Sequence, residues 1–178
     1  MVHDRRTVWL HWVTAFVVVF MWIGAHAIDR FDKGSPRVDA RSVHIVVGVL
    51  LGTLVAYRLF WRLTGGTRLA NVPSGSQMLA RLMHSVLYVL IFTTVALGIL
   101  NAWIRGDSLF GLWRIPLFGN YDAGARHALS QSVVGFHSLS ANLLLLLAGC
   151  HAAVALFHEL VLKDKLMAGM LPQLRARR

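Results

Sequence analysis

Apolar residues run almost uninterrupted along four stretches of this chain, and short polar segments separate them. The stretches cover roughly 7–28, 42–63, 77–103 and 132–162. Each approaches or exceeds the ~20 residues that an α-helix needs to cross the hydrocarbon core of a bilayer. The pattern therefore predicts an all-α protein, a transmembrane four-helix bundle with up-down-up-down topology.

Turn-forming and capping residues suggest where these helices begin and end. The first is expected to end in the polar turn at 29–36, and the second to begin near Ser42, a residue type that often caps helices. The longest connection runs from about 104 to Ser130, and its short apolar run at 109–113 suits the membrane interface. No change in composition marks a second domain, so residues 1–178 are expected to form a single integral-membrane domain.

Composition and charge narrow the class of protein. The chain is 56% hydrophobic, which excludes an ordinary soluble domain. A net charge of +10 could indicate nucleic-acid binding, but these charges lie between the apolar stretches. Most of the basic residues precede the first stretch, separate the second from the third, or follow the fourth. The positive-inside rule then puts both termini in the cytoplasm, with 29–41 and 104–131 outside, and no nucleic acid is expected as a partner.

One tripeptide pattern occurs twice in the last stretch. Gly135 precedes His137 by two residues, and Gly149 precedes His151 in the same way. The two histidines are 14 residues apart, so on a helix they face the same side, about 21 Å apart along the axis. A histidine within a membrane span is expensive and is a functional candidate by default.

Helix depth gives each of these histidines a partner on another span. With both termini inside, His44 and His137 lie near the outer face, while His11 and His151 lie near the inner face. Two imidazoles on opposite sides of an iron are the axial ligands of many b-type haems, and the chain lacks the C-x-x-C-H motif of c-type attachment. The four histidines therefore predict two haem b groups, one at each level.

Two alternatives compete with this interpretation. The histidines could be a scatter of interfacial residues, although two level pairs argue against chance. A transition-metal transporter also uses intramembrane histidines, but it would require acidic partners that the apolar interiors of these spans lack. The single cysteine, Cys150, excludes an intrachain disulfide or a Cys-rich metal site.

Small and basic residues near the histidines are candidate cofactor contacts. Gly48, Gly52, Gly135 and Gly149 would make room for a porphyrin, or would let two helices approach closely. Arg58 follows His44 by 14 residues and reaches the inner level, where it either pairs with a haem propionate or anchors the helix end.

Two further histidines, His84 and His158, fall near the inner ends of their spans. Either could donate a hydrogen bond or a proton to a ligand beside the inner haem, and either could instead face the lipid headgroups. His3 and His127 are expected to be solvated, and His26 to lie at the outer interface or against a loop or haem.

Taken together, these residues resemble the prokaryotic cytochrome b561 family of small di-haem membrane proteins over nearly the whole chain. The resemblance rests on His11, His44 with Gly48, His84, His137, His151 and His158, and on the segments 58–62, 87–88, 109–112, 116, 152–153, 163–164 and 170–172. It assigns the axial ligand role to His11, His44, His137 and His151.

The resemblance implies electron transfer between a one-electron donor and ubiquinone in the bacterial inner membrane, with superoxide as the donor at the periplasmic side in at least one type of member. It would make His158, and secondarily His84, part of a quinone pocket. A superoxide-collecting surface should be cationic, and Lys33, Arg37, Arg114 and Arg126 are the outer-loop candidates. The alternative function is a haem b anchor and electron conduit for a partner dehydrogenase or hydrogenase, which would use another periplasmic electron donor.

Overall fold

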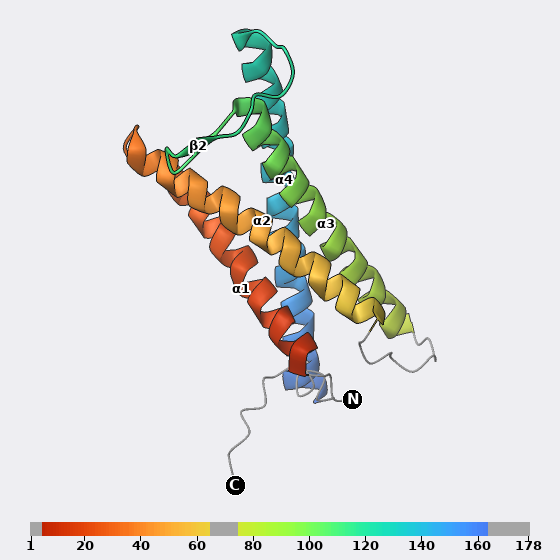
Figure 1. The fold of residues 1–178 in the computed structure, drawn as a ribbon. Coiled ribbons are helices and arrows are strands. Elements are labelled where there is room, and N and C mark those ends of the chain that lie inside the picture. The colour runs from red at the N-terminus through yellow and green to blue at the C-terminus, as the bar shows by residue number, and fades with distance from the viewer. Residues whose placement is uncertain (1–4, 65–74, 164–178) are drawn as a thin grey trace.

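Four long helices make up most of the part of the chain that the structure describes (Figure 1). The computed structural model describes residues 5–64 and 75–163. The helices are α1 (Arg5–Ile28), α2 (Ser35–Thr64), α3 (Gly75–Arg105) and α4 (Ala123–Phe157), which continues into a π-helical turn, η1 (His158–Leu162). A short antiparallel hairpin, β1 (Ser108–Leu109) and β2 (Trp113–Arg114), lies between α3 and α4. All four helices are long and apolar enough to cross a membrane, which confirms the predicted all-α four-helix architecture.

The two ends of the bundle differ. The start of α1 and the end of η1 lie at one end, which we call the inner end (Figure 1). The opposite end, which carries the hairpin, we call the outer end. The orientation of these ends relative to the cytoplasm stays a prediction from charge. Residues 1–4, 65–74 and 164–178 hold much of the basic charge used for that prediction, as well as His3 and the family-like segment 170–172, and they lie outside the described residues.

The second helix begins about two turns earlier than the sequence suggested. It starts at Ser35, with Pro36 in its first turn, where a proline is favoured because its missing N–H would be unpaired anyway. Ser42 is therefore inside the helix, and its predicted N-cap role is wrong. Its side chain is fully buried, and its Oγ donates to the carbonyl of Val38 at 2.7 Å.

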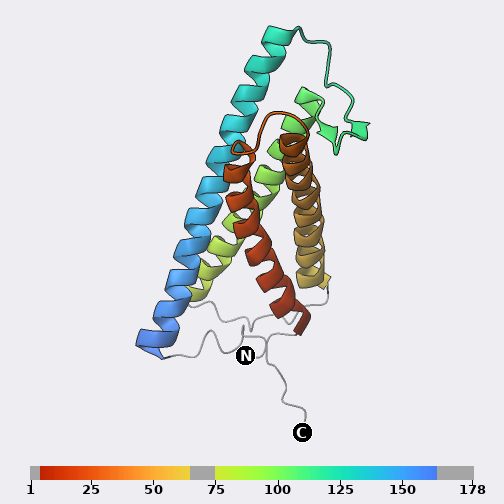
Figure 2. The same cartoon turned by 90° about the vertical axis from the view of Figure 1, so that its left-hand side faces the viewer.

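The fourth helix also begins earlier than its apolar stretch. Asp122 caps it and accepts a hydrogen bond from the backbone N–H of Ala125 at 2.8 Å. The first turns are polar and rise beyond the other helices at the outer end (Figure 2). A hydropathy pattern detects only the membrane-embedded part of such a helix, so the connection between α3 and α4 is shorter than predicted.

A layer of buried apolar side chains fills the middle of the bundle. Its members come from three helices and are Leu51 and Val55 of α2, Ile91 of α3 and Leu144 of α4. Many large apolar side chains, such as Phe16 and Leu146, are instead exposed on the outside of the bundle. An apolar surface of this extent indicates contact with lipid.

Candidate functional site

The outer end brings His44 of α2 and His137 of α4 together. Their ring centroids are 6.2 Å apart and the ring planes are inclined by 73°. The two side chains come from helices remote in sequence, and both are half-buried between the helices. The sequence predicted this pairing from depth alone.

The inner end brings His11 of α1 and His151 of α4 together in a similar way. Their ring centroids are 6.5 Å apart, with the planes inclined by 78°. The core layer of Leu51, Val55 and Leu144 separates this pair from the outer one along the bundle.

The spacing within both pairs suits a six-coordinate iron. Metal–imidazole nitrogen bonds are about 2 Å long, so two imidazoles on opposite sides of one metal have ring centroids roughly 6 Å apart. The observed separations of 6.2 Å and 6.5 Å are close to that value. The residues present therefore fit two haem groups, one between the members of each pair.

His137 is oriented by α3. Its Nδ1 lies 2.9 Å from the backbone carbonyl oxygen of Thr94. A carbonyl only accepts, so Nδ1 carries the hydrogen and Nε2 keeps the lone pair that a metal requires. Ser140 supports this arrangement, because its Oγ accepts from Thr94 Oγ1 and donates to the carbonyl of His137, both at 2.9 Å.

His11 has a different neighbour. Nη2 of Arg58 lies 3.0 Å from His11 Nδ1, and a guanidinium can only donate. In this contact Nδ1 accepts, so a neutral His11 carries its hydrogen on Nε2. The Arg58 guanidinium also lies 5.7 Å from the centre of the Tyr88 ring. The Tyr88 hydroxyl is buried, and it has no hydrogen-bond partner among the described residues.

A third histidine joins the inner pair. The ring of His84 lies 5.2 Å from that of His151, a level partner that the sequence had not identified. This separation is shorter than the roughly 6 Å between the ring centroids of two axial ligands of one iron. His84 is therefore better suited to contact a ligand beside the inner pair than to bind the iron itself. His158 begins η1, and its ring meets that of Phe157 edge-on at 6.4 Å.

The four candidate glycines differ in what a Cβ at each position would contact. A Cβ at Gly52 would come within 3.0 Å of Val95, so this glycine lets α2 and α3 approach closely. A Cβ at Gly48 would make an ordinary contact with Met21 at 3.5 Å. At Gly135 and Gly149 a Cβ would meet no protein atom within 4 Å. These last two are the positions at which helix packing gives no reason for a glycine.

Sequence reasoning missed one glycine beside a candidate ligand. A Cβ at Gly98 of α3 would come within 3.1 Å of Cε1 and 3.3 Å of Nδ1 of His137. Gly98 also lies one turn after Thr94, whose carbonyl holds the same ring. No spacing to another histidine pointed to it, because the contact forms only when α3 packs on α4.

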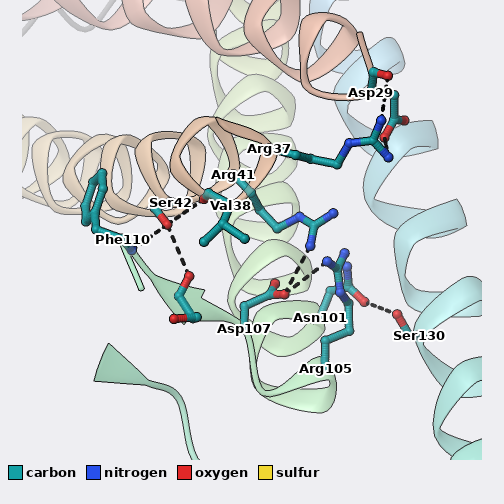
Figure 3. A network of polar contacts seen from close by, with 11 residues as sticks. Asp29, Arg37, Val38, Arg41, Ser42, Asn101, Arg105, Asp107, Phe110 and Ser130 are labelled. Carbon is teal, nitrogen blue, oxygen red and sulfur yellow. Dashed lines mark hydrogen bonds and ion pairs between the residues drawn. The ribbon is translucent and has the colours of Figure 1, made fainter. Parts of the chain in front are cut away.

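Beyond the outer pair, a polar network links α2, α3, α4 and the hairpin (Figure 3). Oδ1 of Asp107 forms ion pairs with Nη1 of Arg41 at 3.5 Å and with Nη2 of Arg105 at 3.0 Å. Nearby, the buried Ser130 of α4 donates to Oδ1 of Asn101 at 2.8 Å. Sequence reasoning singled out none of these residues, although Arg41 lies one turn before His44.

Two of the four cations expected to form an outer cationic surface are used structurally. Arg37 donates to the carbonyls of Asp29 and Phe31. Arg126 donates to four backbone carbonyls, those of Ile104, Phe118, Gly119 and Tyr121, at 3.0–3.5 Å.

His127 is exposed, as expected. His26 bonds within its own helix to the carbonyl of Trp22 at 2.8 Å.

Comparisons with known proteins show the family of the chain. The family model for prokaryotic cytochrome b561 matches residues 2–173. Cytochrome b562 of Cereibacter sphaeroides is 30% identical, with 95% of this chain and 94% of the relative covered. The probable superoxide oxidase CybB of Yersinia pestis is 28% identical, with 93% of each chain covered. Cytochrome b561 homolog 1 of Escherichia coli is 26% identical, with 96% and 97% covered.

The match spans nearly the whole chain and includes all four helices, and cytochromes of b type bind haem through side chains such as the paired histidines. The chain therefore belongs to the prokaryotic cytochrome b561 family and is a multi-pass bacterial membrane protein that binds haem b and transfers electrons.

Proposed function

We propose that this protein is a di-haem oxidoreductase of the bacterial inner membrane, which takes electrons from superoxide at the outer end and delivers them to ubiquinone at the inner end. The observation that carries the proposal is the presence of two histidine pairs, His44 with His137 and His11 with His151, at opposite ends of one bundle. A relative named as a probable superoxide oxidase supports the choice of donor.

The overall reaction balances without any further reactant except protons. Two superoxide anions lose one electron each and leave as dioxygen, while one ubiquinone gains both electrons and two protons to become ubiquinol. Haem, when bound at both levels, supplies one-electron chemistry and so connects the two ends of the bundle.

At the outer level the neighbouring helix orients His137 as a ligand. The Thr94 carbonyl fixes the ring with Nε2 available as a ligand atom. Gly98 leaves space for the ring in that orientation. His44 faces it from α2, and Gly135 lies beside it on α4 without a packing role of its own.

At the inner level, His11 can act as a ligand only if its hydrogen bond with Arg58 changes. For His11 to bind iron through Nε2, its hydrogen must move to Nδ1, and the contact with Arg58 must then open. We propose that the released guanidinium pairs with a haem propionate and that the buried Tyr88 hydroxyl donates to the same carboxylate. One ligand group would thus give a partner to both side chains.

Ubiquinone reduction needs protons as well as electrons. His158 at the start of η1, with His84 beside His151 as the second candidate, would hold the quinone and pass protons from the inner surface. Substitution of His158 by Asn should slow quinol formation while leaving the haem spectrum unchanged. Loss of haem in that variant would instead assign His158 a structural role.

The haem assignment is tested by counting haem in single variants. We expect His44→Ala and His137→Ala to lose the same haem, and His11→Ala and His151→Ala the other, so that the haem-to-protein ratio falls from about two to about one in each. His127→Ala, an exposed residue on the same helix as His137, is the matched control. Full haem content in His137→Ala would overturn the pairing.

A second candidate function is favoured by the outer hairpin. Leu112 is 90% exposed and Trp113 57% exposed there, which suits the docking of a partner dehydrogenase or hydrogenase as well as a membrane surface. Superoxide added to the isolated protein with a ubiquinone analogue separates the two. Rapid haem reduction and quinol formation support the oxidase, whereas neither occurs if a protein partner must deliver the electrons.

A further inference from the structure

Two arginines and one aspartate converge beyond the outer histidine pair. Arg41 of α2 and Arg105 of α3 both contact Asp107, at 3.5 Å and 3.0 Å (Figure 3). About 30% of each arginine side chain is exposed, but only 10% of the Asp107 side chain. The three groups therefore form a half-buried cluster with a net positive charge, which an anion would complete.

Both arginines lie further toward the outer end than the outer pair, Arg41 relative to His44 and Arg105 relative to Gly98, which contacts His137. Arg41 precedes His44 by three residues, about one turn and 4.5 Å toward the outer end on a neighbouring face. Arg105 follows Gly98, the residue against the His137 ring, by seven residues, which is two turns along the same face. The cluster thus lies at the outer end of the bundle, beyond the level of the two imidazoles.

Asp107 positions the two guanidinium groups but uses only part of their hydrogen-bonding capacity. Each guanidinium has five N–H donors, and the contacts with Asp107 use one nitrogen of each arginine. Asp107 is itself held, because the backbone N–H of Ile115 donates to its carbonyl at 2.9 Å, and its own N–H donates to the carbonyl of Ala102 at 3.1 Å. Donors held in this way suit a carboxylate, which arginine binds with two parallel hydrogen bonds.

We propose that Arg41 and Arg105 bind the propionate carboxylates of the outer haem and that Asp107 holds the two arginines in place. The inference rests on the proposed function, since it requires a haem between His44 and His137. Haem carries two carboxylates on one edge of its ring, and ionised groups at membrane depth require charged or polar partners. The cluster supplies two cations at the outer end, where such carboxylates would find charged partners.

Removal of a positive charge and removal of a negative charge from this cluster should shift the midpoint potential of the outer haem in opposite directions. Removal of a cation beside a haem destabilises the reduced state, which carries one more electron, so Arg41→Gln and Arg105→Gln should lower the midpoint potential of one haem. Asp107→Asn should raise the potential of the same haem. Arg114→Gln, an exposed arginine in β2, should leave both potentials unchanged.

Contact with the propionates is tested directly by infrared spectroscopy. The holoprotein is prepared with haem labelled with ¹³C at the propionate carboxyl carbons, and redox-difference spectra isolate the labelled bands. We expect Arg41→Gln and Arg105→Gln to shift the labelled bands of one haem. Arg41→Lys should shift them less than Arg41→Gln, because lysine keeps the positive charge but lacks the two parallel N–H donors of the guanidinium. Arg58→Gln, at the inner end, should leave that haem's bands unchanged.

These experiments distinguish failure of the propionate contact from failure of the proposed outer haem site. If the arginine variants keep both haems and show labelled bands identical to those of the wild type, the propionate contact is wrong, even where a potential has shifted or the reaction with a soluble anion has slowed. If His44→Ala and His137→Ala do not lose the same haem, the proposed haem site itself is wrong.

Discussion

Gly98 of α3 lies against the ring of His137 of α4, so close that a Cβ at Gly98 would come within 3.1 Å of the ring. The ring cannot move aside freely, because its Nδ1 is bonded to the carbonyl of Thr94, one turn earlier on the same helix. Thr94 and Gly98 thus act as a pair: one orients the imidazole and the other makes room for it. This contact explains a glycine that no sequence motif identified.

Gly98→Ala should therefore weaken haem binding at the outer site. The added methyl group displaces the His137 ring from the orientation set by Thr94, and overpacking of this kind costs about 1–3 kcal/mol, or roughly tenfold in affinity. The measurement is the rate of haem release from the purified protein. Gly24→Ala in α1 is the matched control, because a Cβ there would meet no protein atom within 4 Å; equal release rates in the two variants would contradict the prediction.

Tyr88→Phe should loosen the inner haem and leave the outer haem unchanged. The buried hydroxyl has no partner among the described residues, and the loss of one hydrogen bond to a charged group costs about 1.5–3 kcal/mol. The inner haem should dissociate at least about tenfold faster in a competition assay with apomyoglobin. Tyr57→Phe, which alters an exposed tyrosine of α2, serves as the control. Unchanged haem retention in Tyr88→Phe would remove Tyr88 from the site.

Ser42→Ala should destabilise the outer end. Ser42 Oγ accepts from the backbone N–H of Phe110 at 2.8 Å and contacts the carbonyl of Ser108 at 3.1 Å, so it ties the hairpin to α2. An unpaired buried N–H costs about 1–3 kcal/mol, which should lower the Tm measured by differential scanning fluorimetry. Ser85→Ala removes a hydroxyl that bonds within its own helix and is exposed, so its Tm should change little. A Tm equal to that of the wild type in Ser42→Ala would show that the hairpin does not depend on this bond.

Arg126→Lys should release the segment between the hairpin and α4. The guanidinium donates to carbonyls between 104 and 121, and an ammonium cannot reproduce that fork. We expect faster chymotryptic cleavage after Phe118 or Tyr121 when protease is added to intact spheroplasts. Arg114→Lys, in the exposed β2 strand, is the control. Cleavage in inverted vesicles but not in spheroplasts would instead reverse the predicted orientation.

Much of the fold could be predicted because lipid imposes simple requirements on a sequence. A spanning segment must be long, apolar and helical, so hydropathy alone located the four helices. Helix periodicity and alternating direction then predicted the levels of His11, His44, His137 and His151. The structure brings these four together as the predicted pairs.

The features that the sequence did not predict depend on contacts between helices or on polar turns that extend a helix beyond its apolar stretch. Pro36 lies inside the first turn of α2, and Asp122 caps α4 well before its apolar stretch, since helices continue beyond the membrane wherever caps permit. The approach of His84 to His151 follows from the way α3 packs against α4, which periodicity within one helix does not contain.

The sequence by itself determined the class of protein, the number of spans and the depth of each histidine, because these depend on local composition and helix geometry. Only the tertiary structure decided which groups lie beside the histidines, namely Thr94 and Gly98 at His137 and Arg58 at His11. It alone also brought Asp107 to both Arg41 and Arg105. Such contacts depend on the crossing angles and rotation of neighbouring helices, which are set by packing over the whole interface and not by any single segment.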